Sequence, residues 1–219
     1  MSIKYLLSLC LWICVVSTCY SGAFEEGGEA YKAGNYELAA KKFMEVADKN
    51  DHRAMYALGS MYAAGKGVPQ DFHKAYELFT RAARYGRVDA RYKLAILYQE
   101  GLGVTQNDKR AARLFHDAAV KGYGPAQFRL GMCYVNGSGV TQDLVRAGAW
   151  LTVAEDNFRK NPLIPADVQS TTSGNKEPET MKLVDSGIVK QELDKVLAQL
   201  SPEQQQAAAQ LAREYSQTR

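Results

Sequence analysis

Residues 54–86 read AMYALGSMYAAGKGVPQDFHKAYELFTRAARYG, and two later stretches repeat the same pattern. Residues 90–122 read ARYKLAILYQEGLGVTQNDKRAARLFHDAAVKG, and residues 126–158 read AQFRLGMCYVNGSGVTQDLVRAGAWLTVAEDNF. Each stretch begins 36 residues after the one before it, and the three align without a gap. A fixed period of this length indicates stacked copies of one structural unit.

The first half of each copy has the spacing of a helix. Ala54, Leu58 and Tyr62 follow one another at intervals of four residues, which places them on one helical face. A Gly-x-Gly sequence follows, and its glycines can adopt the positive φ angles that end a helix. The equivalent positions in the three copies are Leu58, Leu94 and Leu130; Tyr62, Tyr98 and Tyr134; Gly65, Gly101 and Gly137; and Gly67, Gly103 and Gly139.

The second half of each copy predicts a second helix. Asp71 precedes a new apolar series that includes Ala75 and Phe79, so its carboxylate can cap the free N–H groups of that helix. The counterparts of this cap are Asn107 and Asp143, and basic residues within reach of the caps follow three positions later at Lys74, Arg110 and Arg146. Each copy is therefore a helical hairpin, and stacking of the hairpins builds a continuous core.

These residues resemble the Sel-one-like repeat, a relative of the tetratricopeptide repeat with a longer loop between its helices. The shared pattern is A-x3-L-G-x2-Y-x2-G-x-G-V-x2-D-x2-K-A-x2-L-F-x2-A-A-x2-G, which Ala54 to Gly86 match at nearly every position. The last copy departs from it late, where Glu155 replaces an alanine and the closing glycine is missing. The resemblance implies an all-α fold, a right-handed α-solenoid of stacked antiparallel helix pairs.

An earlier hairpin and a terminal cap complete the predicted array. Ala39, Phe43 and Ala47 are in phase with the second helices, but a shorter loop makes this first pair similar to a tetratricopeptide repeat. Near the end, Ser201-Pro202-Glu203-Gln204 has the sequence of a capping box at the start of a helix. The expected organisation is a signal peptide at 1–23, a tetratricopeptide-like pair at 24–50, repeats at 51–86, 87–122 and 123–158, a flexible linker at 159–182 and capping helices at 183–219.

The N-terminal residues predict export from the cytoplasm. Lys4 precedes an apolar run of about a dozen residues, and small residues follow up to Ala23, as in a cleaved secretory signal peptide. The alternatives are a buried or anchoring N-terminal helix and a lipid anchor at Cys19, for which Thr18 is a poor preceding residue. We expect a periplasmic or secreted protein with no integral membrane segment after signal removal. The L-S-P-E-Q sequence at the terminal helix resembles bacterial members of the family.

Composition and motifs indicate a protein without catalytic, cofactor or metal chemistry. The 27 Lys and Arg residues nearly balance 24 Asp and Glu residues, which gives no nucleic-acid footprint. His52, His73 and His116 share no metal-ligand spacing, and the Gly-x-Gly sequences follow helices rather than the strand of a phosphate loop. After signal removal Cys133 is the only cysteine expected, and its alignment with Met61 and Leu97 predicts a small apolar core residue.

Aromatic residues recur at one position of the first helices and suggest a binding groove. In the tetratricopeptide layout the first helices line a concave surface, where an aromatic ladder can receive a peptide. Packing within the core is the alternative explanation for these rings. The candidate groove residues are Arg53, Tyr56, Ser60, Asp89, Tyr92, Ile96, Phe128 and Met132, with Gln99 and Val135 among the flanking positions.

Three functions remain open at this point. The first is a non-catalytic scaffold of the bacterial cell envelope that binds a protein or peptide, because repeated residues have structural roles while groove positions vary. The second is a secreted factor that acts on a host cell. The third is a cell-wall or β-lactam hydrolase, suggested only by cysteine-rich relatives whose paired cysteines this chain lacks.

Overall fold

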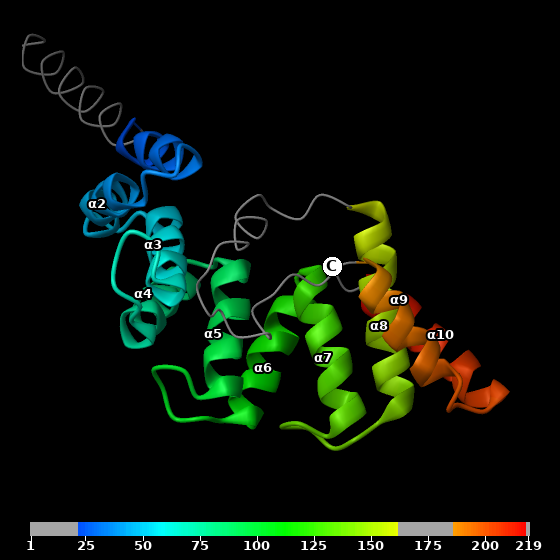
Figure 1. The fold of residues 1–219 in the computed structure, drawn as a ribbon. Coiled ribbons are helices and arrows are strands. Elements are labelled where there is room, and N and C mark those ends of the chain that lie inside the picture. Colours follow the sequence, from blue (N-terminus) through cyan, green and yellow to red (C-terminus); the bar gives the residue numbers. More distant parts are fainter. Residues whose placement is uncertain (1–21, 162–185, 218–219) are drawn as a thin grey trace, which may run out of the picture. The chain divides into compact units, whose positions relative to one another are not determined.

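The protein was analysed as a computed structural model that describes residues 22–161 and 186–217 (Figure 1). Regular secondary structure in these ranges is entirely helical, which confirms the predicted all-α fold. Contacts gather in two compact units, Met1–Ala82 and Ala83–Arg219, and each is described separately. The predicted signal peptide up to residue 21, Cys19 within it and most of the predicted linker lie outside the described residues.

The first unit contains residues 22–32 in a helix, α2 (Tyr36–Ala47), α3 (His52–Ala64) and most of α4 (Phe72–Arg84). Phe43 and Phe79 lie in its core, and glycines make room for both rings. A Cβ on Gly27 would lie 2.8 Å from the ring of Phe43, and a Cβ on Gly59 would lie 2.9 Å from the ring of Phe79. Small residues at these positions let the helices approach closely.

The second unit contains two regular hairpins followed by two further helices. The hairpins pair α5 (Val88–Glu100) with α6 (Asp108–Ala119) and α7 (Gly124–Asn136) with α8 (Leu144–Lys160), and α6 also packs against α7 (Figure 1). Phe115 and Leu151, at the position of Phe79 in the repeat, are fully buried. The second unit therefore stacks its hairpins through the apolar residues that recur in the sequence.

The repeated loop ends one helix and starts the next in the same way each time. Gly65, Gly101 and Gly137 have φ angles of 66°, 68° and 69° at the ends of α3, α5 and α7. The predicted caps are confirmed, because Asp71, Asn107 and Asp143 accept backbone N–H bonds from Lys74, Arg110 and Arg146 at 3.0, 2.9 and 2.9 Å. Each bond satisfies an N–H group that the helix itself cannot use.

The second glycine of the loop has a different purpose, which is close approach to another hairpin. A Cβ on Gly67 would lie 2.1 Å from the carbonyl oxygen of Tyr36, at the start of α2. A Cβ on Gly139 would lie 2.1 Å from the carbonyl oxygen of Asp108, at the start of α6. Tyr36 and Asp108 are equivalent in the 36-residue register, so the first hairpin keeps the phase of the repeats despite its shorter loop.

A cation–aromatic contact also recurs around this loop. The basic residue three positions after each cap lies over the tyrosine that recurs in the preceding helix. The Lys74 Nζ atom lies 5.1 Å from the centroid of the Tyr62 ring, and the Arg110 Cζ atom lies 4.6 Å from that of Tyr98. Arg146 and Tyr134 form the third copy at 5.8 Å. Exposed contacts of this kind contribute about 0.5–1 kcal/mol each, so they support the loop rather than define it.

Helices α9 (Ser186–Leu197) and α10 (Pro202–Gln217) both pack against α8. The predicted capping box is confirmed at the start of α10: Ser201 N donates to Gln204 Oε1 at 2.9 Å, and Gln204 N donates to Ser201 Oγ at 3.3 Å. Buried Val189, Leu193 and Val196 of α9 join the apolar cluster of α8. On α10, Tyr215 stacks on Trp150 of α8 with ring centroids 4.4 Å apart.

Helix α8 is longer than its counterparts and extends to Lys160, into the range predicted as linker from residue 159. In this last part of the helix Phe158 is buried in the core cluster, and Asp156 forms ion pairs with Arg159 at 2.7 Å and Lys160 at 2.5 Å. These hydrogen-bonded partners hold the pKa of the Asp156 carboxyl below its usual value.

Over residues 22–161 and 186–217, no helix combines the length and apolarity that crossing a membrane requires.

Candidate partner-binding pocket

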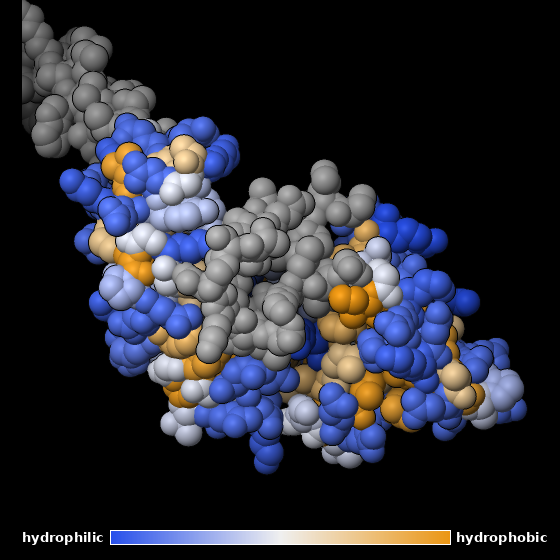
Figure 2. Space-filling model, in the orientation of Figure 1, coloured by the Kyte–Doolittle hydropathy of each residue, from blue (hydrophilic) through white to orange (hydrophobic). Residues whose placement is uncertain are grey.

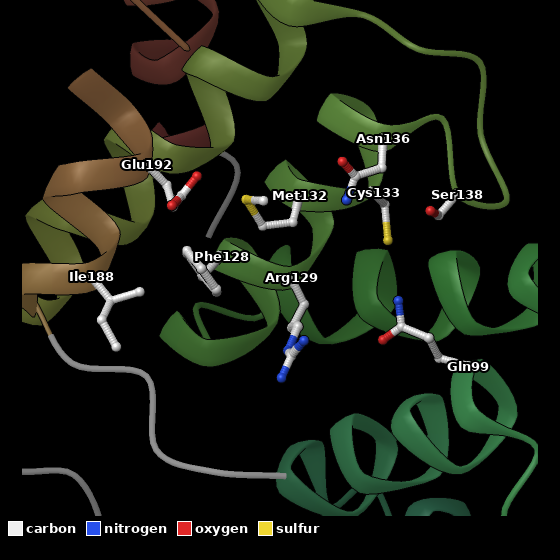
Figure 3. A pocket seen from close by; sticks show the side chains of 9 residues that line it. All are labelled: Gln99, Phe128, Arg129, Met132, Cys133, Asn136, Ser138, Ile188 and Glu192. Carbon is white, nitrogen blue, oxygen red and sulfur yellow. The ribbon is translucent and has the colours of Figure 1, made fainter. Parts of the chain in front are cut away.

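A pocket of about 250 Å³ opens in the second unit between α5, α7, the loop after α7 and α9 (Figure 3). Five of the lining residues come from α7, where intervals of one, three or four residues turn them to one side of the helix. The lining residues are Gln99, Phe128, Arg129, Met132, Cys133, Asn136, Ser138, Ile188 and Glu192.

Apolar side chains form the wall that joins α7 to α9. Phe128 is 7% exposed and belongs to the core cluster of α8 and α9, with Met132 packed against that cluster. Ile188 is 42% exposed on α9, whereas most large apolar side chains among residues 22–161 and 186–217 are more deeply buried. Figure 2 shows apolar residues gathered around α7 and α9 among hydrophilic neighbours. This part of the pocket can accept an apolar group.

Arg129 and Glu192 bring opposite charges to the pocket. Figure 3 shows the Arg129 guanidinium and the Glu192 carboxylate extending from α7 and α9 respectively. Arg129 also hydrogen-bonds to Tyr92, whose pKa is raised because burial outweighs the opposite effect of the arginine. Glu192 forms an ion pair with Lys195 at 2.7 Å, one turn further along α9. Lys195 therefore already neutralises the negative charge of Glu192.

Two further side chains at the pocket wall are polar or polarisable. Gln99, at the end of α5, has a buried Oε1 atom that accepts no hydrogen bond within the described part of the chain. Cys133 is 2% exposed, and burial raises the pKa of its thiol to about 11, despite an opposing effect of Arg129. The burial of Cys133 confirms the prediction that it packs as a core residue.

The predicted groove residues divide into two groups. Phe128 and Met132 line the pocket, as does the flanking Gln99. Tyr56, Tyr92 and Ile96 are 5%, 6% and 0% exposed. Tyr56 and Tyr92 thus pack in the core, the alternative that the sequence left open for the aromatic rings: Tyr56 lies 5.8 Å from Phe79, and Tyr92 lies 5.8 Å from Phe115, between ring centroids.

The other predicted groove residues contact nearby side chains or backbone groups, and Arg53 also lies over the ring of Phe24, 4.3 Å from its centroid. Arg53 pairs with Asp51 at 2.8 Å, and Asp89 pairs with Arg87, so equivalent positions carry the same ion pair with the charges exchanged. Ser60 donates its hydroxyl hydrogen to the Tyr56 carbonyl oxygen at 3.0 Å. A role for these residues in partner binding stays a prediction.

Sequence reasoning missed five pocket residues: Arg129, Asn136, Ser138, Ile188 and Glu192. Ile188 begins an apolar series with helical spacing, and Glu192 follows it by one helical turn. Their meeting with α7 depends on how α9 packs beside α8, which a repeat pattern does not describe.

Within the described ranges, no group of three or more His, Cys, Asp or Glu side chains is placed to hold a metal ion.

Comparison with known proteins identifies the repeat. Residues 52–86, 88–123 and 124–157 each match the profile described as Sel1 repeat. These matches support the Sel-one-like repeat family. They cover the three hairpins that share the 36-residue period and leave the first pair and the final two helices outside.

Solved structures share the fold. A protective antigen present in uropathogenic Escherichia coli strains, which displays an SLR fold, is similar with a TM-score of 0.71 at 24% identity, over 91% of this chain and 38% of that chain. A Sel1 repeat protein from Oxalobacter formigenes is similar with a TM-score of 0.58 at 27% identity, over 61% of this chain and 55% of that chain. The predicted α-solenoid class is thereby confirmed.

Two curated relatives match a shorter stretch. Both are named exopolysaccharide production negative regulator, one from Rhizobium leguminosarum bv. viciae at 36% identity and one from Rhizobium meliloti (strain 1021) at 32%. Each match covers 63 residues, which is 29% of this chain. The matched stretch spans 24% of the length of each relative.

Proposed function

We propose that this protein is a non-catalytic scaffold of the bacterial cell envelope, which binds a segment of a partner protein in the pocket between α7 and α9. The observation that carries the proposal is the pocket wall, where apolar Phe128, Met132 and Ile188 stand beside the charged Arg129. Such a mixture is typical of surfaces that recognise another polypeptide. Sel1 repeats, which cover residues 52–157 with short gaps, are in keeping with a role in protein–protein interaction.

The location in the envelope rests on the N-terminal sequence. The apolar run before Ala23 supports export, and the regulatory names of the Rhizobium relatives fit a protein that acts by binding. Fractionation of the source organism into cytoplasm, periplasm, membrane and medium tests this part. Recovery in the medium would favour a secreted factor, and recovery in the cytoplasm would contradict export.

Site-specific photocrosslinking in the source organism tests the binding role. A photoreactive residue at Ile188 lies at the pocket, and the same residue at Leu38 is a matched control, because both side chains are 42% exposed. We expect Ile188 to capture one discrete protein that Leu38 does not capture, and Met132→Arg to abolish the capture. Equal products at both positions would contradict the proposal.

A further inference from the structure

We infer that the pocket recognises a partner segment in which an acidic side chain lies next to an apolar side chain, with the carboxylate bound by Arg129. The inference rests on the proposed function and adds the chemistry of the occupant. It depends on three kinds of side chain that meet in one small space: an apolar wall, a guanidinium and a buried amide oxygen.

The size of the pocket favours one or two side chains over a cofactor. Sites for drug-sized ligands and cofactors occupy roughly 300–1,000 Å³. This pocket holds about 250 Å³ and is bounded on its apolar side by Phe128, Met132 and Ile188. An aliphatic side chain of a peptide would cover these three residues and remove the exposed surface of Ile188 from water.

Arg129 selects the charge of the neighbouring group. A guanidinium presents five N–H donors in a planar fork that matches a carboxylate, and its hydrogen bond to the Tyr92 hydroxyl helps to orient that fork. Glu192, on the opposite side of the pocket, pairs with Lys195 at 2.7 Å, so a carboxylate of the occupant is favoured beside Arg129 rather than beside Glu192. The acidic side chain of the occupant is thus directed towards α7.

Gln99 indicates a hydrogen-bond donor on the same occupant. A buried acceptor without a partner costs about 1–3 kcal/mol, and a donor from a bound segment removes that cost. Among the residues that the structure describes, the Oε1 atom of Gln99 is such an acceptor. The backbone N–H groups of an extended peptide supply donors at regular intervals, whereas a purely apolar ligand supplies none.

Selection from a phage-displayed library of random twelve-residue peptides tests the inference on the full chain. We expect the selected peptides to carry Asp or Glu within two residues of Leu, Ile, Met or Phe. One selected peptide, made synthetically, and its Glu→Gln or Asp→Asn form are then compared by fluorescence anisotropy. The amide form should bind at least tenfold more weakly to the unaltered protein.

Variants of Arg129 complete a double-mutant cycle. In Arg129→Gln the acidic peptide should bind at least tenfold more weakly, and the acidic and amide peptides should bind alike, because their difference depends on the guanidinium. Arg129→Lys should retain part of the preference, and Arg113→Gln, an exposed arginine on α6, should retain all of it. Thermal unfolding of each variant verifies that it folds. If Arg129→Gln does not fold, Arg129→Lys takes its place in the cycle.

Each other outcome overturns the inference. Selection of no peptide, of peptides without acidic residues, or of peptides whose acid preference survives in Arg129→Gln would show that Arg129 does not read a carboxylate. Self-association of the protein through the pocket, measured by sedimentation, would assign the pocket to a second copy. If Ile188 still captured a discrete partner in these cases, the proposed function would stand and only the chemistry of the occupant would fall.

Discussion

Helices α3 and α7 occupy equivalent places in the repeat, 72 residues apart, yet only their framework residues agree. Both have 13 residues and end at a glycine with a φ angle of 66° or 69°. In both, a glycine within the helix, Gly59 or Gly131, makes room for the apolar residue of the following helix. The shared positions are therefore those that contact a neighbouring helix.

Some of the positions that differ build the pocket. Arg129 and Met132 of α7 stand where α3 has Ala57 and Ser60. Neither replacement alters the helix, because none of these four residues ends or caps it. One set of positions thus specifies the hairpin, while another set can change and give a single copy its own binding chemistry.

The largest expected effect concerns the close approach that both copies share. Gly139→Ala should lower the free energy of unfolding by about 3 kcal/mol or more, because the new Cβ would lie 2.1 Å from the Asp108 carbonyl oxygen. Gly137→Ala is the matched control with a similar φ angle and its nearest contact at 3.5 Å, and it should cost about 1 kcal/mol. Chemical denaturation followed by circular dichroism measures both. Equal losses would mean that close approach is not the reason for the second glycine.

A second prediction concerns an amide pair that α7 has and α3 lacks. Gln127 is 1% exposed, donates to the Ala119 carbonyl oxygen at 3.1 Å and accepts from Asn157 Nδ2 at 3.1 Å. The equivalent residue of α3 is Met55. Gln127→Met should cost about 2 kcal/mol in the same denaturation experiment, because it leaves buried polar groups without a partner.

Gln106→Met, at an exposed glutamine, is the control for that substitution and should change stability by less than about 0.5 kcal/mol. If Gln127→Met proved as stable as the unaltered protein, the amide pair would be irrelevant to the packing of α6, α7 and α8. The contrast with Met55 would then be one of composition alone.

A third prediction exchanges a pocket residue between the two helices. Met132→Ser gives α7 the residue of α3 and should weaken binding of the acidic peptide at least fivefold, while stability falls by only about 1 kcal/mol because Met132 is partly buried. Ser60→Met, the reverse exchange in α3, should leave peptide binding unchanged. Fluorescence anisotropy and thermal unfolding separate the two effects. Binding that survives Met132→Ser would remove this residue from the site.

The smallest expected effect is a pH dependence that distinguishes two versions of the loop cap. The backbone N–H of Lys74 and the charge of its side chain hold the pKa of Asp71 below its ordinary value. The stabilisation is therefore present above about pH 4, where Asp71 is also ionised in the unfolded chain, and is lost as the pH falls through the lowered value. Asn107 is a natural cap without this titration.

Asp71→Asn should accordingly lose less stability than the unaltered protein between pH 6 and pH 2.5, measured as the change in thermal midpoint. Asp117→Asn, at an exposed residue of α6 outside the loop caps, is the control for general effects of charge. Identical acid sensitivity of Asp71→Asn and the unaltered protein would show that this carboxylate does not contribute through its charge.

Local patterns were sufficient to predict most of the helical framework. The loop glycines, the caps at Asp71, Asn107 and Asp143, and the capping box at Ser201 and Gln204 all depend on residues within a few positions of one another. The aromatic ladder was harder to judge from the sequence. Its period is equally compatible with a groove and a core, and only the neighbouring Phe79 and Phe115 rings distinguish them.

The sequence by itself determined the repeat, its two helices, its turns and its caps, because these follow from periodic apolar residues and short-range hydrogen bonds. Only the tertiary structure decided that Arg129 and Met132 share a pocket with Gln99, Ile188 and Glu192. These residues lie far apart along the chain, and α9, which carries the last two, is outside the repeat. Their meeting depends on the packing of α9 against α8, and such long-range packing leaves no period in the sequence.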